Sequence, residues 1–87
     1  ERQAALCLYR SLRKAESLVR NGERESGRIL SAVRGEVEKE PLARLEYASL
    51  CDPATLEELK DIRDEALLAL AVWIGKARLI DNTILKA

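Results

Sequence analysis

The chain has no histidine among its 87 residues and only two cysteines. Histidine is the commonest general base near neutral pH and the commonest metal ligand in proteins. Its absence rules out serine–histidine and cysteine–histidine nucleophile pairs within this chain. Two cysteines cannot supply the four ligands of a structural zinc site. The sequence therefore predicts no catalytic, cofactor-binding or metal-ligating residue of its own.

Long apolar segments are lacking as well. The longest run, Ala66 to Ile74, has nine residues, whereas a helix that spans a membrane needs roughly 20. No basic and then apolar leader opens the chain, so we expect a cytoplasmic protein with no membrane partner. In that setting Cys7 and Cys51 are expected to be reduced, buried small hydrophobic residues. The first residue is glutamate rather than methionine, which suits a fragment of a longer chain.

Charge of one sign is not in excess either, because 15 basic and 15 acidic residues cancel. Residues 1–44 hold ten basic and seven acidic residues, and residues 45–87 hold five and eight. This mild asymmetry lacks the electrostatic footprint of a nucleic-acid-binding protein. With 47% hydrophobic and 34% charged residues, the composition is that of a globular protein. We expect one small domain over residues 1–87.

Two amphipathic helices are predicted in the first half of the chain. The first covers residues 1–19 and ends at Asn21-Gly22, since glycine readily adopts the left-handed conformation after a helix. The second covers residues 23–39 and ends before Pro41. Apolar residues recur at spacings of three and four in both: Ala4, Ala5, Leu8, Leu12, Ala15, Leu18 and Val19, then Ile29, Leu30, Val33 and Val37.

The second half is predicted to be mainly strand. Residues 44–51 have a strand-like pattern, and residues 53–59 are expected to form a short helix with Asp52 as its N-cap. Residues 66–74 and 77–85 then form a hairpin around Gly75-Lys76, because glycine first in a two-residue loop is typical of a type II′ turn. The alanine- and leucine-rich start of residues 66–74 is also compatible with a helix. The sequence predicts an α+β fold with two helices packed on a small antiparallel sheet of about three strands.

The turn also predicts the register of the hairpin. Ile74 faces Ala77, and the following pairs lead to Leu70 opposite Asp81. Because side chains alternate, the bulkier face is expected to meet the helices and to include Asp81. A carboxylate there needs hydrogen-bond donors. This face comprises Leu68, Leu70, Val72, Ile74, Ala77, Leu79, Asp81, Thr83 and Leu85, and the other comprises Ala69, Ala71, Trp73, Arg78, Ile80 and Asn82.

Three weaker motifs are better explained without a function. Gly22 and Gly27 have the glycine spacing of a phosphate loop, but the required lysine and hydroxyl residue do not follow. The carboxylates of residues 57–65 could serve magnesium or acid–base chemistry. The basic cluster Arg10, Arg13 and Lys14 could contact nucleotide phosphates. Solvated faces of charged segments are the favoured interpretation of both clusters.

Arg78, Asp81 and Asn82 are the sharpest candidate site residues. They could contact a substrate or a partner domain. Alternatively, Arg78 could stack on Trp73 while Asp81 and Asn82 hydrogen-bond backbone groups within the domain. Their apolar surroundings favour the second, structural interpretation.

Three pieces of the chain resemble a known family. Glu1-Arg2-Gln3-Ala4-Ala5 with Leu8-Tyr9-Arg10-Ser11-Leu12 is similar to the first helix of the C-terminal domain of the pantothenate synthetase (pantoate–β-alanine ligase) family. Leu45-Glu46-Tyr47, leading to Asp52-Pro53-Ala54-Thr55-Leu56, resembles its first strand and turn. Ala71-Val72 with Gly75-Lys76-Ala77-Arg78-Leu79-Ile80-Asp81-Asn82 resembles its closing hairpin. The hairpin motif is the most specific, although Ala77 stands where the family usually has threonine.

The resemblance implies a function that the residues alone do not give. The family joins pantoate and β-alanine with ATP and magnesium through a pantoyl-adenylate. Its nucleotide-binding and catalytic residues lie in an N-terminal domain, and its C-terminal domain covers the active site. The chain is thus expected to be the cover of such a ligase, inactive alone, with that N-terminal domain as its partner. The alternative is a free-standing, non-catalytic protein-interaction module of the same fold.

Overall fold

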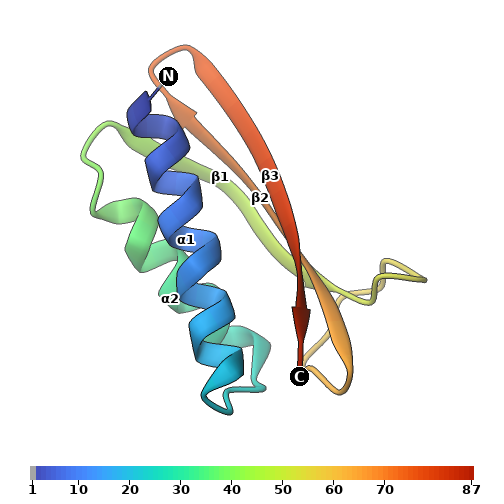
Figure 1. Cartoon of the computed structure of the whole chain (residues 1–87). Coiled ribbons are helices and arrows are strands. Elements are labelled where there is room, and N and C mark those ends of the chain that lie inside the picture. Colours follow the sequence, from blue (N-terminus) through green and yellow to red (C-terminus); the bar gives the residue numbers. More distant parts are fainter. Residues whose placement is uncertain (1) are drawn as a thin grey trace.

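A computed structural model describes residues 2–87, apart from the side chains of Gln3 and Ala4. The elements follow in the order α1 (Arg2–Arg20), α2 (Ser26–Glu38), β1 (Ala43–Cys51), β2 (Glu65–Ile74) and β3 (Ala77–Lys86). Both helices lie on one side of the three strands (Figure 1). The predicted α+β class and two-layer arrangement are confirmed. The expected start of the first helix at Glu1 and the core position of Ala4 lie outside what the structure describes.

Helix α1 ends as its sequence predicts. Gly22 has a φ of 103°, and its N–H donates to the carbonyl of Val19, while the N–H of Glu23 donates to the carbonyl of Leu18. This pair of bonds is the Schellman motif, which satisfies carbonyls that the helix itself leaves unpaired. Helix α2 begins at Ser26 rather than Glu23, because the N–H of Ser26 is bonded to the carbonyl of Lys60.

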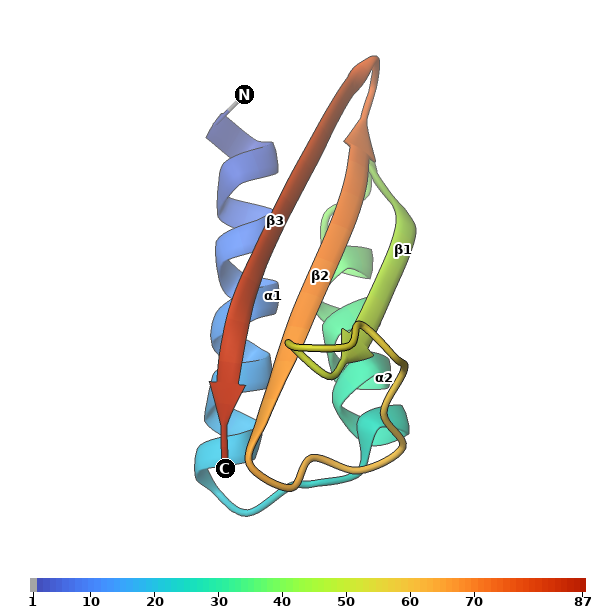
Figure 2. The same cartoon turned by 90° about the vertical axis from the view of Figure 1, so that its right-hand side faces the viewer.

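The strands form one antiparallel sheet with β2 in the centre. Strands β2 and β3 pair from Ile74↔Ala77 to Glu65↔Lys86 without a shift, so the predicted register is confirmed. Gly75 has a φ of 60° and Lys76 has no positive φ, as a type II′ turn requires. Figure 2 shows β3 at one edge of the sheet and β1 at the other.

The core lies between the helices and one face of the sheet. Helix α1 packs on α2, β2 and β3, and α2 packs on β1. The apolar pattern predicted that Ala5 of α1 would be buried, but Ala5 is exposed. Cys7 and Ser11 are buried instead. The buried hydroxyl of Ser11 has a hydrogen-bond partner, because it donates to the carbonyl of Cys7 at 2.9 Å. The fully buried side chains are mainly branched aliphatics: Ile29, Val33, Val37, Leu50, Leu68, Leu70, Val72 and Leu85.

The predicted helix at residues 53–59 is wrong. Asp52 does cap a turn, since its Oδ1 accepts the N–H groups of Ala54 and Thr55 at 2.8 and 3.0 Å. The chain leaves this single turn at Leu56, whose φ is 64°. The N–H of Leu59 then donates to the carbonyl of Leu50. Residues 52–64 therefore form a long loop that projects from the end of β1 (Figure 1).

Candidate functional site

The sheet face away from the helices carries a cluster of polar side chains from all three strands, which we call the open-face cluster: Glu46, Trp73 and Arg78. Glu46 lies in β1, Trp73 in β2 and Arg78 in β3. Trp73 and Arg78 are directly opposite each other in the ladder. The cluster thus joins both edge strands to the centre of the sheet.

A β-bulge explains how Glu46 reaches its partners. Leu45 pairs with Val72 and Tyr47 pairs with Ala71, so Glu46 is the extra residue between them. A bulge inserts one unpaired residue and redirects its side chain. Glu46 can therefore share the open face with Tyr47, its neighbour in sequence, which regular alternation would forbid.

The carboxylate of Glu46 accepts three hydrogen bonds. Its Oε1 accepts from the indole Nε1 of Trp73 at 2.6 Å and from Nε of Arg78 at 2.7 Å, and its Oε2 accepts from Nη2 of Arg78 at 2.9 Å. The two-pronged guanidinium–carboxylate geometry is a strong form of ion pair. These bonds lower the pKa of Glu46, first through Arg78 and then through Trp73, and Glu46 raises the pKa of Arg78.

The surroundings of the cluster are apolar and accessible. The guanidinium carbon of Arg44 lies 5.9 Å from the centre of the Trp73 ring, within the range of a cation–π contact. Tyr47 is 39% exposed, Ile80 55% and Ile84 41% on the same face. Aromatic and arginine side chains held by such contacts are typical of surfaces that bind other proteins.

The structure separates the three residues that the sequence singled out. Arg78 and Asn82 lie on the open face, whereas Asp81 lies on the face of Leu85 and Thr83, toward the helices. Arg78 does not stack on Trp73 as the structural interpretation held. It pairs with Glu46, and Arg44 takes the place over the indole ring.

The expectation for Asp81 needs correction. It has the predicted register opposite Leu70, yet it is exposed. Its Oδ1 accepts one hydrogen bond, from the N–H of Asn82 at 2.8 Å, and no helix end or arginine serves it within residues 2–87. Because β3 is an edge strand, the carboxylate can turn past the edge into water. The sequence predicts buried donors around this carboxylate, but with Asp81 exposed we instead expect Asp81→Ala to cost little stability.

Glu46 was missed as a site residue, although it belongs to the Leu45-Glu46-Tyr47 motif. The signal that could have found it is chemical. Trp73 and Arg78 are predicted to be cross-strand neighbours, and both are donors that an acceptor on a neighbouring strand could bridge. The residue that supplies it depends on the bulge, which the apolar pattern of β1 does not reveal.

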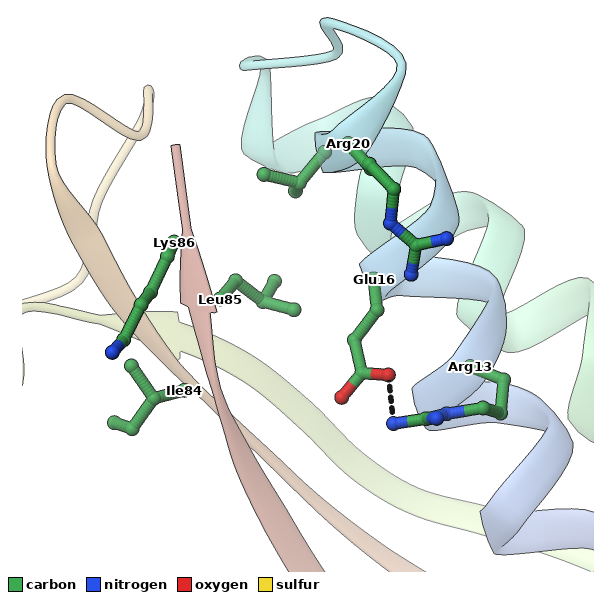
Figure 3. A pocket seen from close by; sticks show the side chains of 7 residues that line it. Arg13, Glu16, Arg20, Ile84, Leu85 and Lys86 are labelled. Atoms are coloured by element: carbon green, nitrogen blue, oxygen red, sulfur yellow. Dashed lines mark ion pairs between the residues drawn. The ribbon is translucent and has the colours of Figure 1, made fainter.

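Two hollows lie elsewhere on the surface. One of about 300 Å³ runs between α1 and β3 and is lined by Arg13, Glu16, Val19, Arg20, Ile84, Leu85 and Lys86. In Figure 3, Leu85 points toward α1, whereas Lys86 lies beyond β3. Glu16 is already satisfied there, because it pairs with Arg13 and accepts from the Thr83 hydroxyl.

The second hollow, of about 240 Å³, is acidic. Asp52, Asp61, Asp64 and Glu65 line it together with Leu59 and Arg63. Within the part of the chain that the structure describes, no three acidic or thiol side chains gather closely enough to hold a metal ion. No helix within residues 2–87 has the length and apolar character to cross a membrane.

Comparison with known proteins identifies the family. The family model described as pantoate-beta-alanine ligase matches residues 1–84. The chain belongs to the pantoate–β-alanine ligase family. Pantothenate synthetase of Thermoanaerobacter sp. (strain X514) is 48% identical over 84 residues, which are 97% of this chain and 30% of that protein. The bifunctional pantoate ligase/cytidylate kinase of Synechococcus sp. (strain JA-3-3Ab) is 44% identical over 98% of this chain and 16% of that protein.

Solved structures agree with this assignment. The crystal structure of pantothenate synthetase from Thermus thermophilus matches with a TM-score of 0.84 and 30% sequence identity. The match covers 94% of this chain and 29% of that one. The chain therefore spans about 30% of the length of its ligase relatives, and this span has the fold expected for their C-terminal domain.

Proposed function

We propose that this chain is the C-terminal cover domain of a cytoplasmic ligase that joins pantoate to β-alanine at the expense of ATP. The observation that carries the proposal is the family match over residues 1–84. The partner is the N-terminal nucleotide-binding domain of the same enzyme, which would bind ATP, Mg²⁺ and both substrates. Residues 1–87 act as one domain without a catalytic group of their own.

The role of a cover follows from the chemistry of the reaction. An acyl-adenylate formed from pantoate is readily hydrolysed, and a closing domain excludes the water that would destroy it. This role needs a stable domain with a surface for its partner rather than catalytic side chains. The dense apolar core and the open-face cluster with its exposed Tyr47 and Ile80 support that role.

The residues that the structure describes do not form a group that fits a magnesium ion. The carboxylates of the acidic hollow do not gather as a metal site in the described residues. The chain carries no histidine. We therefore assign nucleotide and metal binding to the rest of the ligase and derive no step through them here.

A domain exchange tests the proposal. The matching 84 residues of the Thermoanaerobacter pantothenate synthetase are replaced by this chain, and the pantothenate and AMP formed are both measured. We expect the hybrid to form the two products in nearly equal amounts. The same enzyme truncated before this domain should release AMP with little pantothenate, because the adenylate is lost to water. A hybrid that carries Leu70→Asp, which disrupts the core, is the matched control and should behave like the truncated enzyme.

The rival is a free-standing interaction module of the same fold. It would be supported if the hybrid formed as little pantothenate as the truncated enzyme while the exchanged domain remained folded. The relatives reported above are ligases, which favours the cover domain. The isolated chain should also show no heat of ATP binding by calorimetry, and a low-micromolar ATP site on it would contradict the proposal.

A further inference from the structure

Strand β3 has a long edge that no other strand of the described residues covers. The strand order is β1-β2-β3, so only β2 neighbours it there. Its ten residues pair with β2 without a bulge. Ile80 and Ile84 are 55% and 41% exposed. A long, regular edge with apolar side chains is a ready template for a strand from another chain.

The register shows which backbone groups face outward. Residues that flank a two-residue turn exchange hydrogen bonds, and bonded and non-bonded pairs alternate from there. Ile74 and Ala77 flank the turn. Ala77, Leu79, Asp81, Thr83 and Leu85 therefore bond to β2. The N–H and C=O groups of Arg78, Ile80, Asn82, Ile84 and Lys86 face the free edge.

Asp81 occupies the middle of this edge. Its Oδ1 accepts the N–H of Asn82 at 2.8 Å, which is the central outward donor of the five. An added strand would have to displace this charged acceptor and bring its own carbonyl oxygens close to the carboxylate. Charged side chains at an edge are a recurrent means of preventing strand addition.

The edge is complementary to itself. Antiparallel pairing of two β3 strands about Asn82 sets Ile80 opposite Ile84 of the second copy, twice. Cross-strand pairs of β-branched residues stabilise a sheet. The same twofold symmetry joins the two sheets into one of six strands, with both open faces on the same side. It also sets Arg78 opposite Lys86 of the second copy, but Arg78 is already neutralised by Glu46.

We propose that the free edge of β3 is complementary to the same edge of a second copy of this chain, and that the Asp81 carboxylate prevents the two edges from pairing. The opposite edge needs no such residue, because the bulge at Glu46 interrupts the regular ladder of β1. The proposal does not depend on the ligase function, since it concerns only contacts between two copies of this chain.

The first experiment compares Asp81→Ala with the parent by sedimentation velocity from micromolar to several hundred micromolar. Asp64→Ala is the matched control, because it removes an exposed carboxylate from the loop before β2. We expect the parent and the control to sediment as the 9.7 kDa monomer. Asp81→Ala should form a dimer whose dissociation constant is at least roughly tenfold lower than that of the parent.

A second pair of variants tests whether the dimer uses the predicted edge. Asn82→Pro removes the outward N–H, and proline is tolerated in an edge strand where its N–H would face solvent. Asn82→Pro alone should fold and stay monomeric. Asp81→Ala combined with Asn82→Pro should lose the dimer. Unfolding of Asn82→Pro would show that this N–H faces β2, which overturns the proposal.

The remaining outcomes are decisive as well. A folded Asp81→Ala that stays monomeric at the highest concentration overturns the proposal, and so does a dimer that survives Asn82→Pro. Asp81→Thr keeps a strand-forming side chain and should dimerise like Asp81→Ala. Loss of the folded state in both variants would show that Asp81 supports the domain rather than closing its edge.

Discussion

The two faces of the sheet are held by different kinds of contact. On the covered face, Leu68, Leu70 and Val72 are fully buried under the helices. On the open face, one carboxylate joins the indole of Trp73 and the guanidinium of Arg78. Burial of apolar area does not depend on direction, and its total contribution to stability is large. Exposed polar contacts depend on direction, and each one contributes little to stability. The covered face should therefore supply most of the stability of the domain, and the open face should supply the ordered side chains for recognition.

The largest effect should come from opening a cavity on the covered face. Leu70→Ala removes a fully buried side chain and should lower the free energy of unfolding by about 2–5 kcal/mol. Ile80→Ala on the open face is the matched control and should change it by less than about 0.5 kcal/mol. Urea unfolding followed by circular dichroism measures both. Equal losses would show that the two faces do not differ in this way.

A smaller effect is expected from Glu46→Gln on the open face. The amide cannot form the ion pair with Arg78, so the midpoint of urea unfolding should fall at pH 7, but less than in Leu70→Ala. The change should also quench or shift Trp73 fluorescence, because the indole loses its charged acceptor. Ser49→Ala, a neutral change on the same strand, should leave the fluorescence unaltered. An unaltered spectrum in Glu46→Gln would contradict the cluster.

The same residue predicts a pH dependence. The pKa of Glu46 is lowered from its ordinary value of 4.5 by Arg78 and Trp73. A carboxyl with a lowered pKa stabilises the folded state above the ordinary value, and this contribution is lost as pH falls through the lowered pKa. The difference in unfolding midpoint between the parent and Glu46→Gln should thus be constant above about pH 5 and shrink below about pH 4.5. A constant difference into strong acid would contradict the assigned pair.

Thiol chemistry should distinguish the core from the sheet edge without unfolding the protein. Burial raises the pKa of the Cys7 thiol, and nearby Glu40 adds to the rise. Cys51 is only half-buried, with Ser49 beside it. A disulfide reagent at pH 8 should therefore modify Cys51 well before Cys7. Equal rates would show that the core opens, and a melting temperature that drops with reductant would show a disulfide.

The smallest effect is expected from Asp81→Ala on the stability of the monomer. Its side chain is exposed and bonds only the adjacent N–H among the described residues. At a concentration low enough to prevent association, its unfolding free energy should match the parent within about 0.5 kcal/mol. A loss of stability comparable to that of Leu70→Ala would show that Asp81 supports the fold as a core residue does.

Much of the fold could be predicted because its signals are local. The Gly75-Lys76 turn determined every pair from Ile74↔Ala77 onward, since a two-residue loop allows one register. The end of α1 at Gly22 followed from the conformational freedom of glycine. The error at residues 53–59 has a tertiary cause. Asp52 starts a turn as a cap should, but the pairing of Leu59 with Leu50 draws the chain away.

The site was less predictable, because it depends on how far each side chain is buried and on the bulge at Glu46. Alternation placed Asp81 on the face toward the helices. The alternation of side chains does not show that a carboxylate at the sheet edge can turn past that edge into water. The role of Glu46 depends on one unpaired residue between Leu45 and Tyr47. Leu45 and Leu50 are five residues apart, so in a strand without the bulge they would lie on opposite faces, and the apolar pattern of β1 therefore shows no regular alternation.

The loop of residues 52–64 bears on how the chain is made. The N–H of Ser26 donates to the carbonyl of Lys60, and the N–H of Ile62 donates to the carbonyl of Arg24. Proteins are synthesised from the N-terminus, so α2 lacks these partners until the loop has left the ribosome. The buried residues of β2 are made immediately afterwards. The link between the loop and the start of α2 can thus form just before β2 is made, and β3 follows both.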